Sequence, residues 1–371
     1  MKVCIIIDAW YPVVGGGQVY VHELANRLVS QHNCSVDIYT RKLRSESTAV
    51  PVSTPKYIVH RLGWLTSFHN PFARVAFLIQ AIWLLLWRRY DVLNPQSILP
   101  GIVGKIVGGL TRTPVILTVH GTALFRPQPT RLFPRLIRWV EFCILTRIKY
   151  TRQITVSENF RQLKNVNRHI VVIPNGVDLA PFDGPRVDKW KNPTLLYVGR
   201  FDPIKGIDVL IHAMALLQTK RPDVRLRLVG YGAEGEALRR LVHSLHLNEA
   251  VDFVGQLQGE SLSKEYLAAH VFVLPSRSEG YPLTILEAWA ARLPVVATDV
   301  GAVAEIISRS GGGIVVPSDR PDELANAIEQ MLGTDRPYGV FGRRYVESEA
   351  LWDKAVVSTY KIFQETVDAQ P

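Results

Sequence analysis

The sequence Ser276-Arg-Ser-Glu-Gly-Tyr-Pro-Leu-Thr-Ile-Leu-Glu-Ala288 follows an apolar run, Val271 to Pro275. The run predicts a buried strand, and the polar and glycine residues after it predict a loop. Pro282 has the φ angle that suits the first turn of a helix. A buried strand, a loop and a helix in succession are typical of α/β folds, in which ligands meet the carboxyl ends of parallel strands.

Two glutamates in this stretch are suited to polar ligands. Glu279 falls in the loop and Glu287 about one turn inside the predicted helix. Their carboxylates can accept hydrogen bonds from sugar and ribose hydroxyls. The backbone N–H groups around Leu283 and Thr284, together with the helix dipole, form an anion site suited to phosphate. Two exposed helix glutamates without a ligand are the competing interpretation.

Strand and helix patterns alternate through the rest of the chain, which predicts two doubly wound parallel sheets. Residues 174–193 lack apolar periodicity and are rich in Pro, Gly, Asn and Asp, so we expect the connection there. The predicted domains span 1–180 and 181–344, and residues 345–371 are predicted to form a C-terminal helix, with its apolar pattern over 345–366, that packs back on the first domain. The expected strands are 3–8, 35–40, 57–61, 91–94, 114–120, 153–156 and 170–173, then 194–199, 225–230, 251–255, 271–275, 294–298 and 313–316.

Length and composition exclude several classes of protein. The chain has 371 residues, 47% of them apolar and 20% charged, enough for two hydrophobic cores. The three cysteines have neither disulfide-framework nor zinc-ligand spacing, which favours a reducing compartment and a cytoplasmic location. The longest uncharged apolar stretch, Val75 to Trp87, has 13 residues, fewer than the roughly 18 that span a bilayer.

The basic excess is confined to the first half of the chain. Residues 1–185 contain 22 basic and 9 acidic residues, a net charge of +13. Residues 186–371 contain 21 basic and 24 acidic residues, a net charge of −3. Such a field attracts phosphates, nucleic acid or an anionic lipid surface, and composition alone does not choose among them.

Two cations follow the first predicted strand of the second domain. Arg200 ends that strand and Lys205 follows a turn that contains Pro203, so both can approach one ligand. A departing diphosphate needs a metal or fixed cations. The chain contains no Asp-x-Asp triplet, the usual metal–diphosphate ligand, so we expect the two cations to take the metal's place.

In the first domain, Gly15, Gly16 and Gly17 follow the first strand and open a helix at about Gln18. The dinucleotide spacing G-x-G-x-x-G fails because Tyr20 holds the third glycine position, which argues against NAD. His120 ends the strand 114–120 and is placed at the ligand-binding edge.

Taken in chain order, these residues resemble retaining glycosyltransferase family four (glycosyltransferase group 1) over nearly the whole chain. The motifs are the glycine loop, His120-Gly121, Asn175-Gly-Val-Asp178, Gly199-Arg200, Lys205-Gly206, and Glu279 followed by Glu287. The resemblance implies the GT-B fold, an α/β architecture with two Rossmann-like domains that face each other across a cleft.

The resemblance also implies a role for each motif. Arg200 and Lys205 would hold the donor diphosphate, with Gly16 and Gly17 over it. Glu287 would hold the ribose hydroxyls and Glu279 the hydroxyls of the donor sugar, with His120 near its anomeric carbon. The remaining donor-binding residues would be Gly255, Gln256 and Leu257 at the nucleobase, and Gly280, Tyr281, Leu283 and Thr284 beside the helix start. Many members of the family have Gly where Pro282 stands, so one backbone donor is missing and the identity of the sugar stays open.

Two basic and aromatic stretches bear on the acceptor. Phe72 to Arg89 and Arg131 to Lys149 combine apolar and aromatic side chains with several arginines. Such helices suit an anionic bilayer surface, and the alternative is that they simply cover the first sheet. We found no nucleic-acid-binding module and expect no nucleic-acid partner.

The sequence therefore predicts a metal-independent retaining glycosyltransferase without a cofactor. Its donor would be a UDP- or GDP-linked sugar, and its acceptor a hydroxyl group, lipid-linked or membrane-associated. We expect a cytoplasmic protein, peripheral on the membrane. A sugar-nucleotide 2-epimerase is the main alternative; a phosphorylase and a non-catalytic binding module are weaker ones. Fold analogy alone does not separate these activities.

Overall fold

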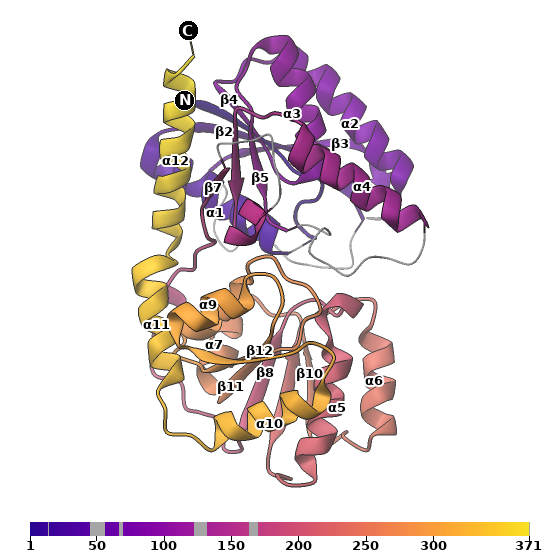
Figure 1. Ribbon diagram of the computed structural model, residues 1–371, viewed down its shortest axis with the longest axis vertical. Helices are drawn as coiled ribbons and strands as arrows, with labels where there is room; N and C mark the ends of the chain where they lie inside the picture. The colour runs from indigo at the N-terminus through magenta and orange to yellow at the C-terminus, as the bar shows by residue number, and fades with distance from the viewer. Residues whose placement is uncertain (14, 45–55, 67–69, 122–131, 163–169, 371) are drawn as a thin grey trace. The chain divides into compact units, whose positions relative to one another are not determined.

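The structure is a computed structural model that describes residues 1–13, 15–44, 56–66, 70–121, 132–162 and 170–370. The chain divides into two compact units (Figure 1). Unit 1 comprises Met1–Asn175 and Trp352–Pro371, and unit 2 comprises Gly176–Leu351. Each unit is an α/β domain with its own parallel sheet.

Unit 1 contains strands in the order β3-β2-β1-β4 and a second set in the order β5-β6-β7. Parallel bridges from Leu93 to Val115 and from Gln96 to Thr118 place β5 beside β4 and join the two sets. The strands are β1 (Lys2–Ile6), β2 (Ser35–Leu43), β3 (Ile58–Thr66), β4 (Val92–Pro95), β5 (Ile116–Val119), β6 (Arg152–Thr155) and β7 (Ile170–Val172). The α-helices are α1 (Gly16–His32), α2 (Pro71–Leu86), α3 (Ile98–Thr111), α4 (Leu132–Arg147) and α12 (Trp352–Asp368).

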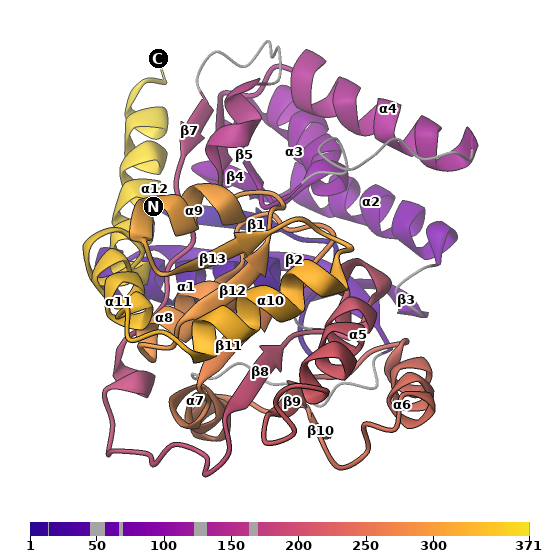
Figure 2. The same cartoon turned by 60° about the horizontal axis from the view of Figure 1, so that its bottom comes forward.

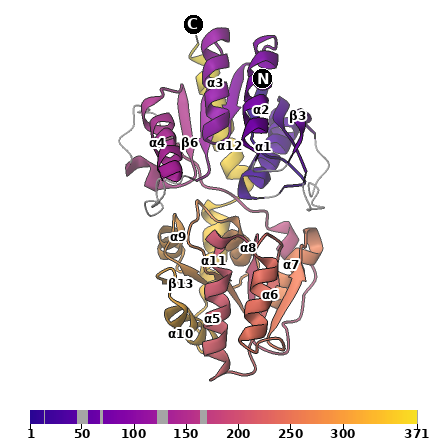
Figure 3. The same cartoon turned by 90° about the vertical axis from the view of Figure 1, so that its right-hand side faces the viewer.

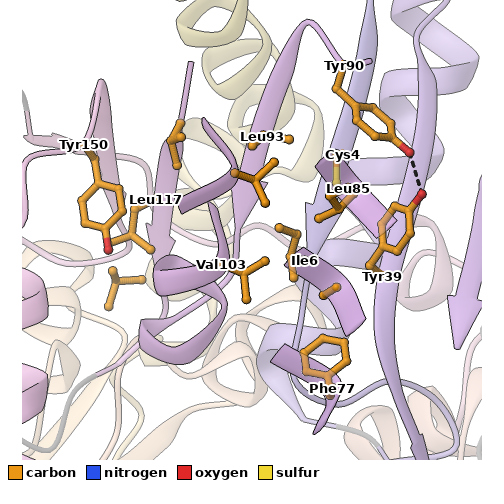
Figure 4. Packing of buried hydrophobic residues seen from close by; sticks show 14 of the residues in the cluster. Cys4, Ile6, Tyr39, Phe77, Leu85, Tyr90, Leu93, Val103, Leu117 and Tyr150 are labelled. Atoms are coloured by element: carbon orange, nitrogen blue, oxygen red, sulfur yellow. Dashed lines mark hydrogen bonds between the residues drawn. The ribbon is translucent and has the colours of Figure 1, made fainter. Parts of the chain in front are cut away.

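One apolar core of unit 1 lies where α2 and α3 meet the sheet. Side chains of β1 and β4 pack there with Phe77 of α2 and Val103 of α3, all of them fully buried (Figure 4). Tyr39 and Tyr90 bring hydroxyls into this core. The two hydroxyls lie 2.7 Å apart, and that of Tyr90 donates to Asp37 at 2.8 Å. The buried polar groups are therefore paired, as a dry core requires.

Unit 2 contains a six-stranded parallel sheet in the order β10-β9-β8-β11-β12-β13 (Figure 2). Helices cover both of its faces, α5 packing with α6 and α10, and α8 with α11 (Figure 3). The strands are β8 (Thr194–Val198), β9 (Arg225–Val229), β10 (Val251–Gly255), β11 (Val271–Leu274), β12 (Val295–Thr298) and β13 (Gly313–Val316). The α-helices are α5 (Ile207–Gln218), α6 (Gly235–Ser244), α7 (Gly259–Ala268), α8 (Leu283–Ala290), α9 (Val303–Ser310), α10 (Pro321–Leu332) and α11 (Tyr338–Glu349).

The prediction of one helix over 345–366 is wrong. Two helices occupy this stretch, α11 in unit 2 and α12 in unit 1. Between them, Leu351 forms a parallel bridge with Val177, and the N–H of Val177 donates to the carbonyl of Ala350 at 2.9 Å. A helical backbone cannot make that pairing, so the helix is interrupted there. Beyond the break α12 packs on α1, where Tyr360 stacks on His32 with ring centroids 3.9 Å apart.

Candidate functional site

The candidate residues fall into one group in each unit. Gly16, Gly17 and His120 lie in unit 1, and the other candidates lie in unit 2. Most of the second group follows β8 and β11, which are neighbours in the sheet. The order of strands β9-β8-β11 places two sequence-distant loops side by side, because the carboxyl ends of parallel strands meet at one edge.

The loops after β8 and β11 touch through their backbones. The N–H of Arg277 donates to the carbonyl of Ile204 at 2.8 Å. Gly206 has a φ of +62°, and a Cβ there would lie 2.1 Å from the carbonyl oxygen of Pro275. Both the left-handed conformation and the close approach require glycine. The glycine of the Lys205-Gly206 motif therefore allows the two loops to meet.

Arg277 fixes this contact with charged hydrogen bonds. Its guanidinium donates to both carboxylate oxygens of Asp208, at 2.9 and 2.7 Å, to Asp319 at 2.6 Å, and to the carbonyl of Pro203 at 2.7 Å. Burial alone would raise the pKa of Asp208, but the bonds from Arg277 outweigh it and lower the pKa. A bidentate arginine–carboxylate pair of this kind is geometrically specific.

Lys205 and Glu279 meet at the junction of the two loops. The Nζ of Lys205 lies 2.7 Å from Oε1 of Glu279, and the hydroxyl of Ser276 donates to the same oxygen at 2.6 Å. The Glu279 side chain is 9% exposed and that of Lys205 is 21% exposed. The structure thus brings together the residue predicted to hold the diphosphate and the one predicted to hold the sugar.

Glu287 lies in α8, which begins at Leu283, the residue after Pro282. The hydroxyl of Tyr266 donates to Oε2 of Glu287 at 2.6 Å. Burial raises the pKa of Glu287, and the bond from Tyr266 offsets this only in part. Pro282 gives α8 no side-chain cap, so the first-turn N–H groups, including those of Leu283 and Thr284, are not capped by it.

The rest of the loop after β11 is held by its backbone. The carbonyl of Gly280 accepts from the N–H of Ala302 at 3.1 Å. The Tyr281 hydroxyl lies 3.1 Å from that of Tyr345 in a buried position. The structure therefore places Tyr281 in the packing beneath the loop, with its backbone beside the start of α8.

The remaining candidates of unit 2 have partners other than Lys205 and Glu279. Arg200 is half exposed and pairs with Asp202 at 2.7 Å. Gly255 ends the edge strand β10, two strands away from β8, and Gln256 and Leu257 follow it. Gly255 has a φ of +88° with open space where a Cβ would be, and its carbonyl accepts from Gly230 at 2.8 Å.

In unit 1, α1 begins at Gly16, two residues before the expected start. A Cβ on Gly17 would lie 3.5 Å from Cδ2 of His120, so the glycine lies against the imidazole. The ring of Tyr20 meets that of His120 edge to face, with centroids 4.6 Å apart. Nε2 of His120 lies 2.8 Å from Oε1 of Gln96. Burial lowers the pKa of His120 to about 4, so the ring is neutral near pH 7.

Sequence reasoning missed the residues that hold the candidates in place. Ser276, Tyr266 and Gln96 are ordinary residue types without a recognisable motif, and only the fold shows that they contact Glu279, Glu287 and His120. Ser276 alone had a usable signal, since it opens the loop that contains Glu279. Arg131, the first residue of the basic and aromatic stretch 131–149, lies outside the described residues.

Both halves of the chain match family models of glycosyltransferases. Residues 14–181 match the family model described as "Glycosyltransferase Family 4", and residues 185–342 match that of "Glycosyl transferases group 1". Together the two matches cover most of the chain.

Among curated proteins, the chain is 27% identical to the D-inositol 3-phosphate glycosyltransferase of Arthrobacter sp. (strain FB24), over 95% of this chain and 91% of that protein. It is 32% identical to the phosphatidyl-myo-inositol mannosyltransferase of Mycolicibacterium smegmatis, over 66% of this chain and 63% of that protein. Among solved structures, the sucrose-phosphate synthase of Thermosynechococcus elongatus superposes with a TM-score of 0.85 at 26% identity, covering 100% of both chains. The predicted fold is confirmed: the chain belongs to glycosyltransferase family four, has the GT-B fold, and is a glycosyltransferase.

Proposed function

We propose that this glycosyltransferase moves a sugar from a nucleotide-diphosphate donor to a hydroxyl acceptor, with retention of anomeric configuration and without a metal ion. The observation that supports this most strongly is the junction of the β8 and β11 loops. There a partly buried cation, Lys205, lies 2.7 Å from Glu279, a residue of the loop that leads into α8. A cation and a helix amino end are together suited to a diphosphate.

The pair of Lys205 and Glu279 supports an exchange in which Lys205 leaves Glu279 and binds the diphosphate of the donor. Without donor, Glu279 neutralises Lys205 and so reduces the cost of burying the cation. A diphosphate would attract the ammonium group more strongly than one carboxylate does, because it carries about two charges. Glu279, still bonded to Ser276 at 2.6 Å, would then accept hydrogen bonds from the sugar hydroxyls.

In the proposed reaction, the bond between the anomeric carbon and the diphosphate oxygen breaks, and its electron pair leaves with the diphosphate. Lys205, Arg200 and the first-turn N–H groups of α8 stabilise the growing negative charge. The acceptor oxygen bonds to the anomeric carbon on the face that the diphosphate leaves, and its proton passes to a donor phosphate oxygen. Glu287 holds the ribose, its carboxylate accepting hydrogen bonds from the ribose hydroxyls.

The acceptor side of the proposal rests on α2. Its inward residues Ala73, Phe77, Ala81 and Leu85 are buried. Its outward face is also apolar, and the side chains of that face are between 55% and 78% exposed: Phe72, Val75, Ile79, Trp83 and Trp87. Exposed apolar and aromatic residues in a stripe of this length are typical of a surface that meets another apolar phase.

An anionic bilayer is the partner that fits this face. The helix is followed by exposed Arg88 and Arg89, and the neighbouring strand β3 adds exposed Trp64 and Leu65. Basic groups beside aromatic ones match anionic headgroups above acyl chains. No helix in the described part of the chain is both long and apolar enough to cross a membrane. We therefore propose a peripheral contact and an acceptor that is lipid-linked or membrane-bound.

The donor half is tested by a thermal-shift screen of UDP- and GDP-linked sugars with and without EDTA, followed by NMR of the product. One nucleotide class should raise Tm, since a ligand at 100 times its Kd stabilises by about 2.7 kcal/mol. The product should keep the donor's anomeric configuration in EDTA. Inverted product, or turnover that EDTA abolishes, contradicts the proposal. Epimerised donor without acceptor would favour the isomerase, an activity that none of the relatives named above carries in its name.

A further inference from the structure

The side-chain amides of Asn94 and Gln96 form a chain of hydrogen bonds that ends at His120. The orientation of each amide follows from the group it contacts, beginning at the far end of the chain. The chain starts at the backbone carbonyl of Ile116, which can only accept a hydrogen bond. The Nδ2 of Asn94 donates to this carbonyl at 2.7 Å and to the hydroxyl of Thr118 at 2.8 Å. The amide nitrogen of Asn94 therefore faces β5, and its oxygen Oδ1 faces the other way.

Gln96 is oriented by that oxygen. Its Nε2 lies 2.5 Å from Oδ1 of Asn94 and 3.3 Å from the backbone carbonyl of the same residue. Both partners are acceptors, so the amide nitrogen of Gln96 must point towards them. Its carbonyl oxygen Oε1 then faces His120, 2.8 Å from Nε2. An oxygen acceptor at this distance requires a proton on Nε2.

The same reasoning leaves Nδ1 of His120 without a proton. A neutral imidazole carries one N–H, and burial keeps this ring neutral at physiological pH. Nδ1 is therefore a hydrogen-bond acceptor. It is buried and has no hydrogen-bond partner within the described ranges of the chain. Buried acceptors normally have a hydrogen-bond donor, so a buried acceptor without one suggests that its donor belongs to a ligand.

We propose that Gln96 is a positioning residue that locks His120 in the Nε2–H tautomer, so that Nδ1 accepts a hydrogen bond from a hydroxyl of the donor sugar. This inference rests on the proposed function. The ring cannot easily turn to present Nε2 instead, because Gly17 lies against one side and Tyr20 against another. Nδ1 is covered in this structure, so the contact forms when the site rearranges around the donor.

The tautomer is tested directly by NMR of histidine 15N in the ligand-free protein, without any assay of activity. In the wild type, His120 should show a protonated Nε2 and a bare Nδ1 from about pH 5 upwards. Gln96→Met removes the acceptor and should move the proton partly or wholly to Nδ1. Gln96→Glu keeps an oxygen acceptor for Nε2, so Nε2 should still carry a proton; the spectrum is recorded at alkaline pH because a neighbouring carboxylate raises the pKa of the ring. Thr118→Val is the matched control, since Ile116 still orients Asn94, and it should leave the tautomer unchanged.

A proton on Nδ1 in the wild type, or a Gln96→Met spectrum identical to the wild type, would overturn the inference. If Gln96→Met does not fold, the wild type and Gln96→Glu still decide it, because both must show the proton on Nε2.

The role of the tautomer in sugar binding is tested by calorimetry with UDP, UDP-glucose, GDP and GDP-mannose. Gln96→Met should weaken the nucleotide sugar roughly tenfold more than the parent nucleotide, the size expected for one hydrogen bond. Equal weakening of both ligands, or none, contradicts the sugar contact. A wild type that binds none of the four ligands contradicts the proposed function and with it the sugar contact, whereas the tautomer itself is still decided by NMR.

Discussion

The two units hold the polar side chains of their candidate sites in different ways. In unit 2 the loop junction is held by pairs of charged side chains, Lys205 with Glu279 at 2.7 Å and Arg277 with Asp208 at 2.7 Å. In unit 1 the His120 site is neutral and built from amides, and it ends on an acceptor without a partner in the part of the chain described.

The difference matches the two parts of a nucleotide sugar. A diphosphate is an anion, and paired charges can release a cation to it at little desolvation cost. A hexose is neutral and is recognised through hydroxyl groups, for which a fixed amide and imidazole chain gives direction without charge. Under the proposed function, the ion pairs of unit 2 would serve affinity for the donor, and the direction of the hydrogen bonds in unit 1 would serve specificity for its sugar.

The largest effect is expected from removing the cation of unit 2. Lys205→Met should lower turnover by a factor of about 100 to 1,000, the usual loss when one fixed group at a departing anion is removed. The measurement is the release of nucleoside diphosphate with the donor identified by screening. Lys220→Met is the matched control, because it breaks an exposed pair with Glu329 at 2.9 Å in the same unit. Near-normal turnover of Lys205→Met would remove Lys205 from the donor site.

The backbone junction is tested by Gly206→Ala. This change forces a Cβ to within 2.1 Å of the Pro275 carbonyl and strains a φ of +62°. It should lower the free energy of unfolding of unit 2 by about 1–3 kcal/mol and displace Lys205. Gly255→Ala has comparable φ strain, at +88°, but open space, so it isolates the clash. Denaturant titration should show the larger loss for Gly206→Ala, and equal losses would mean that the close approach is unimportant.

The membrane contact concerns unit 1 only. Replacing Ile79 and Trp83 of α2 by glutamate should reduce binding to vesicles that contain anionic lipid by tenfold or more, since two apolar side chains leave the interface and two charges enter it. Co-flotation measures this, and Leu216→Glu, on an exposed position of α5 in unit 2, is the control. If the wild-type protein does not co-float with anionic vesicles, or if it dimerises through this exposed face of α2, the membrane proposal is contradicted.

The smallest effect is a pH dependence from the neutral histidine. The pKa of His120 is lowered to about 4 in the folded chain against about 6.5 unfolded, so the unfolded state binds more protons between these values. Its contribution to stability is therefore complete above pH 6.5 and is lost as the pH falls towards 4. His120→Gln should reduce the slope of stability against pH in this window by at most about 1.4 kcal/mol per unit. An unchanged slope would mean that the folded ring titrates normally.

Sequence reasoning reached the fold because its signals are local. Each of the thirteen expected strands has a counterpart in the structure, since short β-branched runs between turns identify buried parallel strands. It failed at Ala350 and Leu351, where an apolar helical pattern continues but the backbone pairs with Val177. A partner more than 170 positions away leaves no trace in local periodicity.

The candidate site was also predictable only where its signals are local. Glycine motifs and charged residues could be found because their chemistry is unusual for their positions, as with Lys205-Gly206 and Glu279. The contact between Lys205 and Glu279 could be expected from strand adjacency, but not its distance. Gln96 could not be found, because its role depends on facing His120 at the end of the neighbouring strand while it is bonded to Asn94 of its own strand.

Calorimetric titration of UDP and GDP in EDTA, against wild type, Lys205→Met and Lys220→Met, tests the central assignment most directly. We predict that one of the two nucleotides binds the wild type and Lys220→Met equally well, and binds Lys205→Met at least tenfold more weakly. Equal affinity for Lys205→Met, or no binding of either nucleotide to the wild type unless a divalent ion is added, would contradict the account.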